Sequence, residues 1–364
     1  MGDAVSAAAV SRGRATAADS IGDTVSVWFD GITMPMTLTG DDSLKAARQA
    51  AADYARRAKA DNTRRAYRAA VHAWCNWCDH HQLSPLPASG ADVAAFLAAE
   101  RGRGLTPQTL KLRRAAIRYL HRAANQPVPT DDVCVSDTLA GIQREAAGRG
   151  EMRRKKVAAT APIIRRLIAP IPVDLRGLRD RAVILVGFAG ALRRSELAAI
   201  QIEHLEATPR GIRVILPQTK GEQTQPVTVP LPYGDTDLCP VAALERWQAA
   251  AQISTGPLFR RIWLPPQRRA ITAQVALPAM RLGTTSLTAQ SIALIVQHRA
   301  MLAGFGQRDL GGHSLKRGAL TSGMEVGAHP ARLKRLGRHK SYAMLGEYLE
   351  FGDLFEGHPL NGIL

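Results

Sequence analysis

Hydrophobic positions recur every three or four residues along much of the chain, which is the spacing of amphipathic helices. The segment NTRRAYRAAVHAWCNWCDHH begins at Asp61 or Asn62, either of which is a favoured N-cap. Its apolar stripe consists of Tyr67, Ala70, Val71, Trp74 and Trp77. Similar patterns occur in SLKAARQAAADYARRAKA, ADVAAFLAAERG, TPQTLKLRRAAIRYLHRAAN and SDTLAGIQREAAG. Together they predict a helical domain over residues 44–150.

One side of this predicted domain is strongly basic. In TPQTLKLRRAAIRYLHRAAN the apolar positions Leu110, Ile117 and Leu120 should face inward, which leaves the arginines and the lysine outside. An ordinary solvated charged face is the alternative to a nucleic-acid surface. The candidate phosphate contacts of this domain are Arg64, Arg65, Lys111, Arg113 and Arg114.

The period of the pattern changes beyond residue 150. IRVILP (212–217) and PVTVPL (226–231) alternate apolar residues with others around the polar turn QTKGEQTQ, which predicts a β-hairpin. Helical patterns flank it on both sides. We therefore expect a mainly α fold with a small antiparallel β-sheet. The basic residues 151–158 would link the helical domain to a mixed second domain at 159–364, with Arg153, Arg154 and Lys155 crossing a phosphate backbone.

Charge is unevenly distributed along the chain. Residues 1–43 contain two arginines and six aspartates, a net charge of −4, and are predicted to be a mostly flexible acidic arm with room for one short strand. The whole chain carries +17, so the remainder carries +21. A folded portion this basic favours a polyanionic partner, first of all nucleic acid, although charge alone also fits a ribosome-associated protein.

The four cysteines do not suggest a disulfide framework in a chain of 364 residues. WCNWCDHH, with Cys75, Cys78, His80 and His81, has the residue types of a zinc site, but no second CxxC accompanies it, and we favour packing cysteines. There is no apolar run long enough to span a membrane and no secretory signal pattern. We therefore expect a cytoplasmic protein without membrane association.

Four separated motifs carry the candidate chemistry. They are GALRRSELAAI with Arg193, the hairpin turn with Lys220, GGHSLKRGAL with His313, and LGRHKSYAMLGEYLE with His339 and Tyr348. Taken singly, each has an ordinary explanation as a surface charge or a core aromatic. Taken together, in this order and behind a basic helical domain, they resemble the tyrosine recombinase (phage integrase) family.

The resemblance implies a SAM-like core-binding domain followed by a mixed α+β catalytic domain. The residues that follow Tyr348 would form a C-terminal tail at 349–364. It also implies the residue spacings seen here, 27 residues from Arg193 to Lys220 and nine from His339 to Tyr348. The implied activity is site-specific DNA recombination through a covalent 3′-phosphotyrosine intermediate, in the integration or excision of a mobile element. No cofactor or metal is implied. The implied partners are double-stranded DNA, three further copies of the chain in a synaptic tetramer, and a directionality factor.

The residue types suit this chemistry. A phenol, here Tyr348, can attack phosphorus and hold the phosphate as an ester, while a guanidinium such as Arg193 grips two phosphoryl oxygens. Lys220 is placed by the resemblance to protonate the leaving oxygen, with His313 and His339 hydrogen-bonding the phosphate or moving protons. Tyr342 is a rival nucleophile, but the family spacing favours Tyr348.

Lys316 departs from the family pattern, which has an arginine at that position. Lysine keeps the charge but loses the two-pronged grip. Either Lys316 serves as a single-point contact, with Arg317 beside it as a DNA-binding residue, or Arg317 reaches the phosphate instead; we favour the first. Two other functions stay open: a catalytically inactive DNA-binding accessory factor, and an enzyme resembling a type IB topoisomerase or telomere resolvase.

Overall fold

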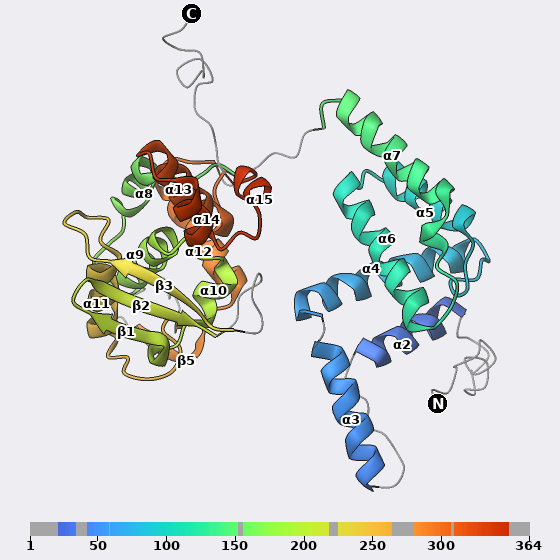
Figure 1. Ribbon diagram of the computed structural model, residues 1–364, viewed down its shortest axis with the longest axis horizontal. Helices are drawn as coiled ribbons and strands as arrows, with labels where there is room; N and C mark the ends of the chain where they lie inside the picture. The colour runs from blue at the N-terminus through green and yellow to red at the C-terminus, as the bar shows by residue number, and fades with distance from the viewer. Residues whose placement is uncertain are drawn as a thin grey trace, which may run out of the picture. The chain divides into compact units, whose positions relative to one another are not determined.

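The computed structural model describes residues 21–33, 42–57, 59–151, 156–217, 225–263, 280–306 and 309–348. The chain divides into two compact units, Met1–Arg153 and Arg154–Leu364, shown in Figure 1. Each unit has its own hydrophobic core. The predicted mainly helical fold with small antiparallel sheets is confirmed.

The described part of the first unit is helical. α4 packs against α2 and α6, and α5 packs against α7. The starts of α5 and α6 follow the sequence signals, because Ser89 and Thr106 accept hydrogen bonds from the backbone three residues on. The elements are α2 (Ile21–Thr33), α3 (Asp42–Arg57), α4 (Asp61–His80), α5 (Gly90–Gly102), α6 (Pro107–Ala123), η1 (Pro129–Asp131) and α7 (Val133–Gly148).

The prediction of a flexible arm or strand is wrong for residues 21–33, which form α2. Val25 and Phe29 lie one helical turn apart and are both buried in the core of the first unit. Asp79 of α4 anchors the start of the helix, accepting a 2.9 Å hydrogen bond from the backbone N–H of Gly22. The apolar face of this segment packs on the core, which outweighs its polar, acidic composition. The remaining residues 1–20 and 34–41 of the predicted arm lie outside the described part of the chain.

Cys75 and Cys78 belong to the core of the first unit, next to the stacked rings of Trp74 and Trp77. Burial raises the pKa of the Cys75 thiol to about 11 and raises that of Cys78 further, so both stay protonated. They are packing residues, as predicted. Among the residues that the structure describes, no three His, Cys, Asp or Glu side chains are grouped to hold a metal ion.

The second unit contains the predicted hairpin within a three-stranded antiparallel sheet. Val214 of β2 pairs with Val229 of β3, and β1 adds a strand on the other edge of β2 that the sequence pattern did not indicate. A second antiparallel pair, β4–β5, was also missed. The strands are β1 (Leu205–Thr208), β2 (Gly211–Leu216), β3 (Val227–Pro232), β4 (Arg260–Trp263) and β5 (Arg281–Ser286).

Helix α9 forms the centre of this unit and packs against α11 and α13. Two glycines allow close approach around α13. A Cβ at Gly318 would lie 1.8 Å from the carbonyl oxygen of Ala159, and one at Gly187 would clash with Leu197 and Leu315. The elements are α8 (Ala161–Ile168), α9 (Leu175–Ala189), α10 (Arg194–Ala199), η2 (Ile202–His204), α11 (Pro240–Ala251), α12 (Ala289–Leu302), α13 (Gly312–Glu325), α14 (Pro330–Gly337) and α15 (Tyr342–Gly346).

The last two helices form a small separate cluster with α13. Leu320, Leu333 and Leu345 are its buried members, and Tyr348 packs against them. This places the end of the described chain on α13 rather than on the sheet. No helix in the described ranges is long and apolar enough to cross a membrane.

Candidate active site

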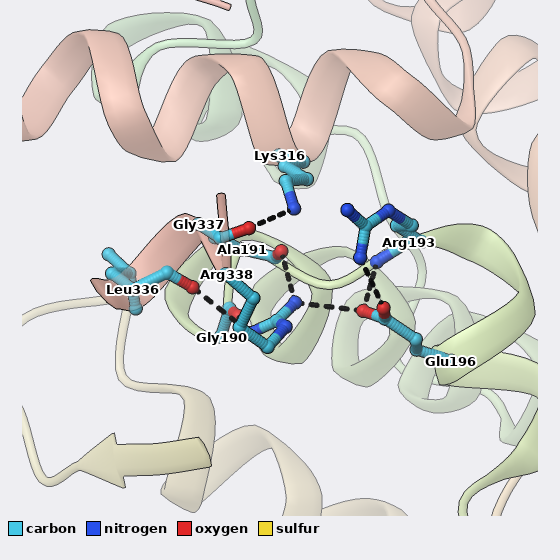
Figure 2. A network of polar contacts seen from close by, with 8 residues as sticks. All are labelled: Gly190, Ala191, Arg193, Glu196, Lys316, Leu336, Gly337 and Arg338. Atoms are coloured by element: carbon cyan, nitrogen blue, oxygen red, sulfur yellow. Dashed lines mark hydrogen bonds and ion pairs between the residues drawn. The ribbon is translucent and has the colours of Figure 1, made fainter. Parts of the chain in front are cut away.

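Three segments that are far apart in sequence meet in the second unit. Arg193 is the N-cap residue of α10, Lys316 lies in the second turn of α13, and Arg338 and His339 follow α14. Figure 2 shows the side chains of Arg193, Lys316 and Arg338 pointing toward one another from these different elements. The site is therefore a cluster of cations assembled by tertiary packing.

Glu196 is the carboxylate that holds two of these cations together. Its Oε1 accepts a 2.7 Å hydrogen bond from Nη1 of Arg193, and its Oε2 accepts a 2.8 Å bond from Nη2 of Arg338. The backbone N–H of Arg193 also donates to Oε2 at 2.8 Å. Burial tends to raise the pKa of Glu196, but the charge of Arg338 and the hydrogen bonds from Arg193 outweigh it and leave that pKa below its usual value. Glu196 is thus an ionised bridge.

Lys316 has no exposed surface, and its ammonium donates a hydrogen bond to the carbonyl oxygen of Gly337. Burial, followed by the charges of Arg193 and Arg338, lowers the pKa of Lys316 to about 7. The Nζ atom also lies 5.5 Å from the ring centroid of Tyr348. Lys316 can therefore change charge near neutral pH, which an arginine at this position could not do.

His339 is only 5% exposed, and among the described residues neither of its ring nitrogens has a hydrogen-bond partner. Burial, followed by the charges of Lys316, Arg193 and Arg338, lowers the pKa of His339 to about 4, so the ring is neutral at pH 7. Buried polar groups normally have partners, because leaving one unpaired costs about 1–3 kcal/mol. An unpaired ring beside three cations fits a site that binds an anionic ligand.

The tyrosine predicted as nucleophile lies next to this ring. The centroids of His339 and Tyr348 are 4.5 Å apart, with the planes at 66°. The rival Tyr342 is more than half exposed, and the ammonium of Lys334 lies over its ring. Of the two candidate phenols, Tyr348 is the one beside Lys316 and His339.

Two other predicted site residues, Lys220 and His313, take no part in the contacts given above. Lys220 lies in 218–224, outside the described residues. His313 is described and exposed, in the first turn of α13, three residues before Lys316. Their assignments stay predictions.

The choice between Lys316 and Arg317 now has a structural basis. Arg317 is also buried, but its Nη1 donates to the carbonyl oxygen of Lys156, where the chain enters the second unit. The Lys316 ammonium instead lies in the cation cluster. Arg317 holds the segment before α8, and a direct DNA contact for it stays a prediction.

Arg338 is the site residue that sequence reasoning missed. It stands next to the predicted His339 in LGRHKS, but nothing in the pattern distinguishes it from the other arginines nearby. Its partners, Glu196 and the carbonyls of Gly190 and Ala191, lie more than 140 residues earlier in the chain. Only the folded structure shows that this side chain belongs to the site.

The basic residues proposed to contact DNA from the helical unit differ in their surroundings. Arg65 and Lys111 are exposed, and Arg64 is half-buried and pairs with Asp61. Arg113 donates to the buried carboxylate of Glu100 and to a backbone carbonyl, and Arg114 bonds the carbonyl of Thr130 and the hydroxyl of Ser136. These two also hold the unit together. Arg153, Arg154 and Lys155 lie outside the described residues.

Buried cations around a neutral histidine, with a tyrosine at their edge, define a site suited to transferring a phosphoryl group to a phenol. Comparison with known proteins agrees. The phage integrase N-terminal SAM-like domain matches residues 53–126. An integrase/recombinase XerD homologue from Selenomonas ruminantium is 34% identical over 329 residues, which cover 88% of this chain and 89% of that relative.

More distant matches are of the same kind. Tyrosine recombinase XerD of Yersinia pestis is 27% identical over 277 residues, covering 74% of this chain and 80% of the relative. A crystal structure of the XerH site-specific recombinase, in a post-cleavage complex with a palindromic difH substrate, shares the fold, with a TM-score of 0.60, 14% identity and 94% of both chains covered. The chain belongs to the tyrosine recombinase family, and the resemblance seen in the four motifs is confirmed.

Proposed function

We propose that this recombinase cuts and rejoins double-stranded DNA through a 3′-phosphotyrosine formed at Tyr348, in the integration or excision of a mobile element. One observation carries the assignment of the site. The ring of His339 has no hydrogen-bond partner among the described residues and lies beside both the buried cations and Tyr348, where a phosphodiester would supply the missing partner.

The reaction is an exchange of one phosphate ester for another. The phenolic oxygen of Tyr348 forms a bond to phosphorus while the bond from phosphorus to the 5′-oxygen breaks. The phenol loses a proton to solvent or a nearby base, and the 5′-oxygen gains one. Because the new ester retains the energy of the old one, the reverse attack by a 5′-hydroxyl rejoins the strand without ATP.

Fixed cations lower the barrier by stabilising charge on the phosphoryl oxygens. Arg193 keeps Nη1 on Glu196, and among the described residues no hydrogen bond engages its Nε or Nη2, which leaves donors for a phosphoryl oxygen. Lys316 supplies a single-point charge. Neutral His339 can donate from one ring nitrogen, and exposed His313 can reach the phosphate as DNA docks. We assign protonation of the leaving oxygen to Lys220.

DNA binding would be shared between the units. Exposed Arg65 and Lys111 of the helical unit, together with the linker residues Arg153, Arg154 and Lys155, would neutralise backbone phosphates. The resemblance to the family supports two protomers on each DNA site and four in the synaptic complex. A directionality factor is a further partner of the proposed reaction.

The experiment is to trap the covalent intermediate. The target site is first recovered by sequencing DNA bound to the purified protein, and the protein is then incubated with that site carrying a nick near the scissile phosphate. We expect a protein–DNA adduct with wild type and with Tyr342→Phe, and none with Tyr348→Phe. An adduct that persists in Tyr348→Phe, or maps to Tyr342, would overturn the assignment. Specific binding with no adduct would instead indicate a DNA-binding accessory factor.

A further inference from the structure

Arg338 makes contacts on both sides of the candidate active site. Its Nη1 donates to the carbonyls of Gly190 and Leu336, each at 3.0 Å. Its Nη2 donates to the carbonyl of Ala191 at 2.7 Å and to Oε2 of Glu196 at 2.8 Å. Figure 2 shows this guanidinium between the end of α14 and the turn that precedes Arg193.

These bonds determine what Arg338 can and cannot do. A guanidinium has four hydrogens on its two Nη atoms, and all four are engaged with protein acceptors. The remaining Nε is buried and has no partner in the described part of the chain. Arg338 therefore cannot offer a phosphate the paired Nη donors of a two-pronged grip. It does not replace the arginine that the family has at the position of Lys316.

Its acceptors have a common origin. Gly190 and Ala191 follow α9, and the carbonyls at a helix C-terminus carry partial negative charge that attracts a cation. Ala191 has φ of 43°, an unfavourable left-handed conformation for a residue with a side chain. Arg338 thus stabilises a strained turn whose next residues lead directly to Arg193.

The same residue controls the other side of the site through its backbone. Arg338 ends α14 in the left-handed conformation, with φ of 52° and ψ of 50°. The residue before it, Gly337, accepts the hydrogen bond from Lys316, and the residue after it is His339. A shift of Arg338 would therefore move the acceptor of Lys316 and the ring of His339 together.

We propose that Arg338 is a positioning residue that locks the segment carrying His339 and Tyr348 onto the segment carrying Arg193, with the carboxylate of Glu196 as the shared bridge. The segment that carries His339 and Tyr348 must pack against the segment that carries Arg193 before Arg193, Lys316 and Arg338 reach their positions in the site. Assembly of the site is thus coupled to the position of the nucleophile's own segment. The catalytic consequence rests on the proposed function, whereas the docking itself does not.

The first test needs no DNA and no activity. Hydrogen–deuterium exchange of the full-length protein is compared for wild type, Arg338→Gln and Glu196→Gln. We expect both variants to exchange faster in peptides covering 190–199 and 336–348, by more than any loss of global stability speeds exchange in the other core helices. The matched control, Arg335→Gln, removes an exposed arginine from the last turn of α14 and should change neither peptide. Wild-type exchange at 190–199 in Arg338→Gln would overturn the proposal.

The second test measures single-turnover cleavage of the nicked site at saturating DNA. Misplacement of a reacting group by about 1 Å can cost about 100-fold, so we expect Arg338→Gln to lose between about 10- and 100-fold in rate, with DNA affinity changed less than about twofold. The charge of Arg338 helps to lower the pKa of Lys316. The pH above which the cleavage rate falls, as Lys316 loses its proton, should therefore be higher in Arg338→Gln than in wild type. Arg335→Gln should match wild type in all three measurements.

If Arg338→Gln does not fold, the proposal can still be tested with a second variant, Arg338→Lys. Arg338→Lys keeps the charge, but one ammonium cannot make the four hydrogen bonds of the guanidinium. The variant should still exchange faster than wild type in both peptides, whereas the pH dependence of its cleavage rate should match wild type. Unchanged exchange in Arg338→Lys would overturn the proposal. If Tyr348→Phe still formed the adduct, the proposed function would fail and the exchange results would stand.

Discussion

The ring of His339 lies edge-on to the ring of Tyr348, with the centroids 4.5 Å apart. Tyr348 lies nine positions after His339 along the chain, and the short helix α15 is between them. Leu345 of that helix packs with Leu320 and Leu333, which fixes the return path of the chain toward His339. The nine-residue spacing of the motif therefore reflects one small helix turning the chain back onto the cation cluster.

Cleavage should depend on the charge of Lys316. The pKa of Lys316 in the free protein is about 7, and only its protonated form can stabilise the phosphoryl oxygens. We expect kcat/KM of the wild type to fall as pH rises above about 7, by about tenfold per pH unit at the high end. Lys316→Arg, which stays charged, should keep its cleavage activity at pH 9.

The measurement is kcat/KM for the nicked site from pH 5.5 to 9.5. Lys334→Arg, the same change on α14, should retain the wild-type profile. If kcat/KM of Lys316→Arg still falls above pH 7, the group that titrates is not Lys316.

The buried lysine should also reduce stability. Its pKa falls from 10.5 to about 7 on folding, so the unfolded chain binds the proton more tightly. The resulting penalty is fully present below pH 7 and disappears as pH rises toward 10.5. We expect Lys316→Met to raise the free energy of unfolding by about 1–2 kcal/mol at pH 6, and to abolish cleavage.

Thermal unfolding of Lys316→Met and wild type at pH 6 and at pH 10 measures this difference. The gain in Tm should shrink at the higher pH. A gain of the same size at both values would show that packing rather than charge is responsible.

Glu196→Gln should be destabilising in a way that depends on pH. The pKa of Glu196 is held below its usual value, so its contribution to stability is present above the unfolded pKa of 4.5 and lost as pH falls through the folded value. At pH 7 the variant leaves two buried guanidiniums without their anion, at a cost of about 3–5 kcal/mol. Urea unfolding at pH 7 and pH 3 should show the difference narrowing at pH 3.

Gly318→Ala should disrupt the packing that carries Lys316. The added Cβ would lie 1.8 Å from the carbonyl oxygen of Ala159, so α13 or the segment before α8 must move. We expect a loss of at least about 2 kcal/mol in the free energy of unfolding, together with slower cleavage. Gly141→Ala, on α7 with no atom within 4 Å of the new Cβ, should be neutral or stabilising by up to about 1 kcal/mol.

Helix α2 should behave as part of the first unit. Phe29 is fully buried and meets the ring of Tyr119 edge-on at 6.0 Å. Phe29→Ala should cost about 3–5 kcal/mol, whereas Val27→Ala, at a position 71% exposed on the same helix, should stay within about 0.5 kcal/mol of wild type. Equal stabilities in urea unfolding would contradict the packing of α2 on α4.

The sequence predicted the elements whose signals are local. The apolar stripe that includes Val71 and Trp74, the caps at Ser89 and Thr106 and the alternation in β2 and β3 each depend on neighbours a few residues away. Helix α2 was missed because its acidic surroundings resemble a solvated arm, and its two buried apolar side chains, Val25 and Phe29, become informative only with α4 beside them. The strands β1 and β4 were missed because they have only four residues each, and β5 because RLGTTS lacks alternating apolar positions. All three depend on pairing with a neighbouring strand.

For the site, the sequence by itself determined which chemical groups are present and in what order. The order and spacing of Arg193, Lys220, His313, His339 and Tyr348 were sufficient to indicate the family. Only the tertiary structure decided that Arg338 joins the two halves through Glu196 and that Lys316 rather than Arg317 lies in the cluster. It also showed that the His339 ring has no hydrogen-bond partner within the described part of the chain. The physical reason is that charge state and hydrogen bonding depend on burial and on partners more than 100 residues away, which no local pattern records.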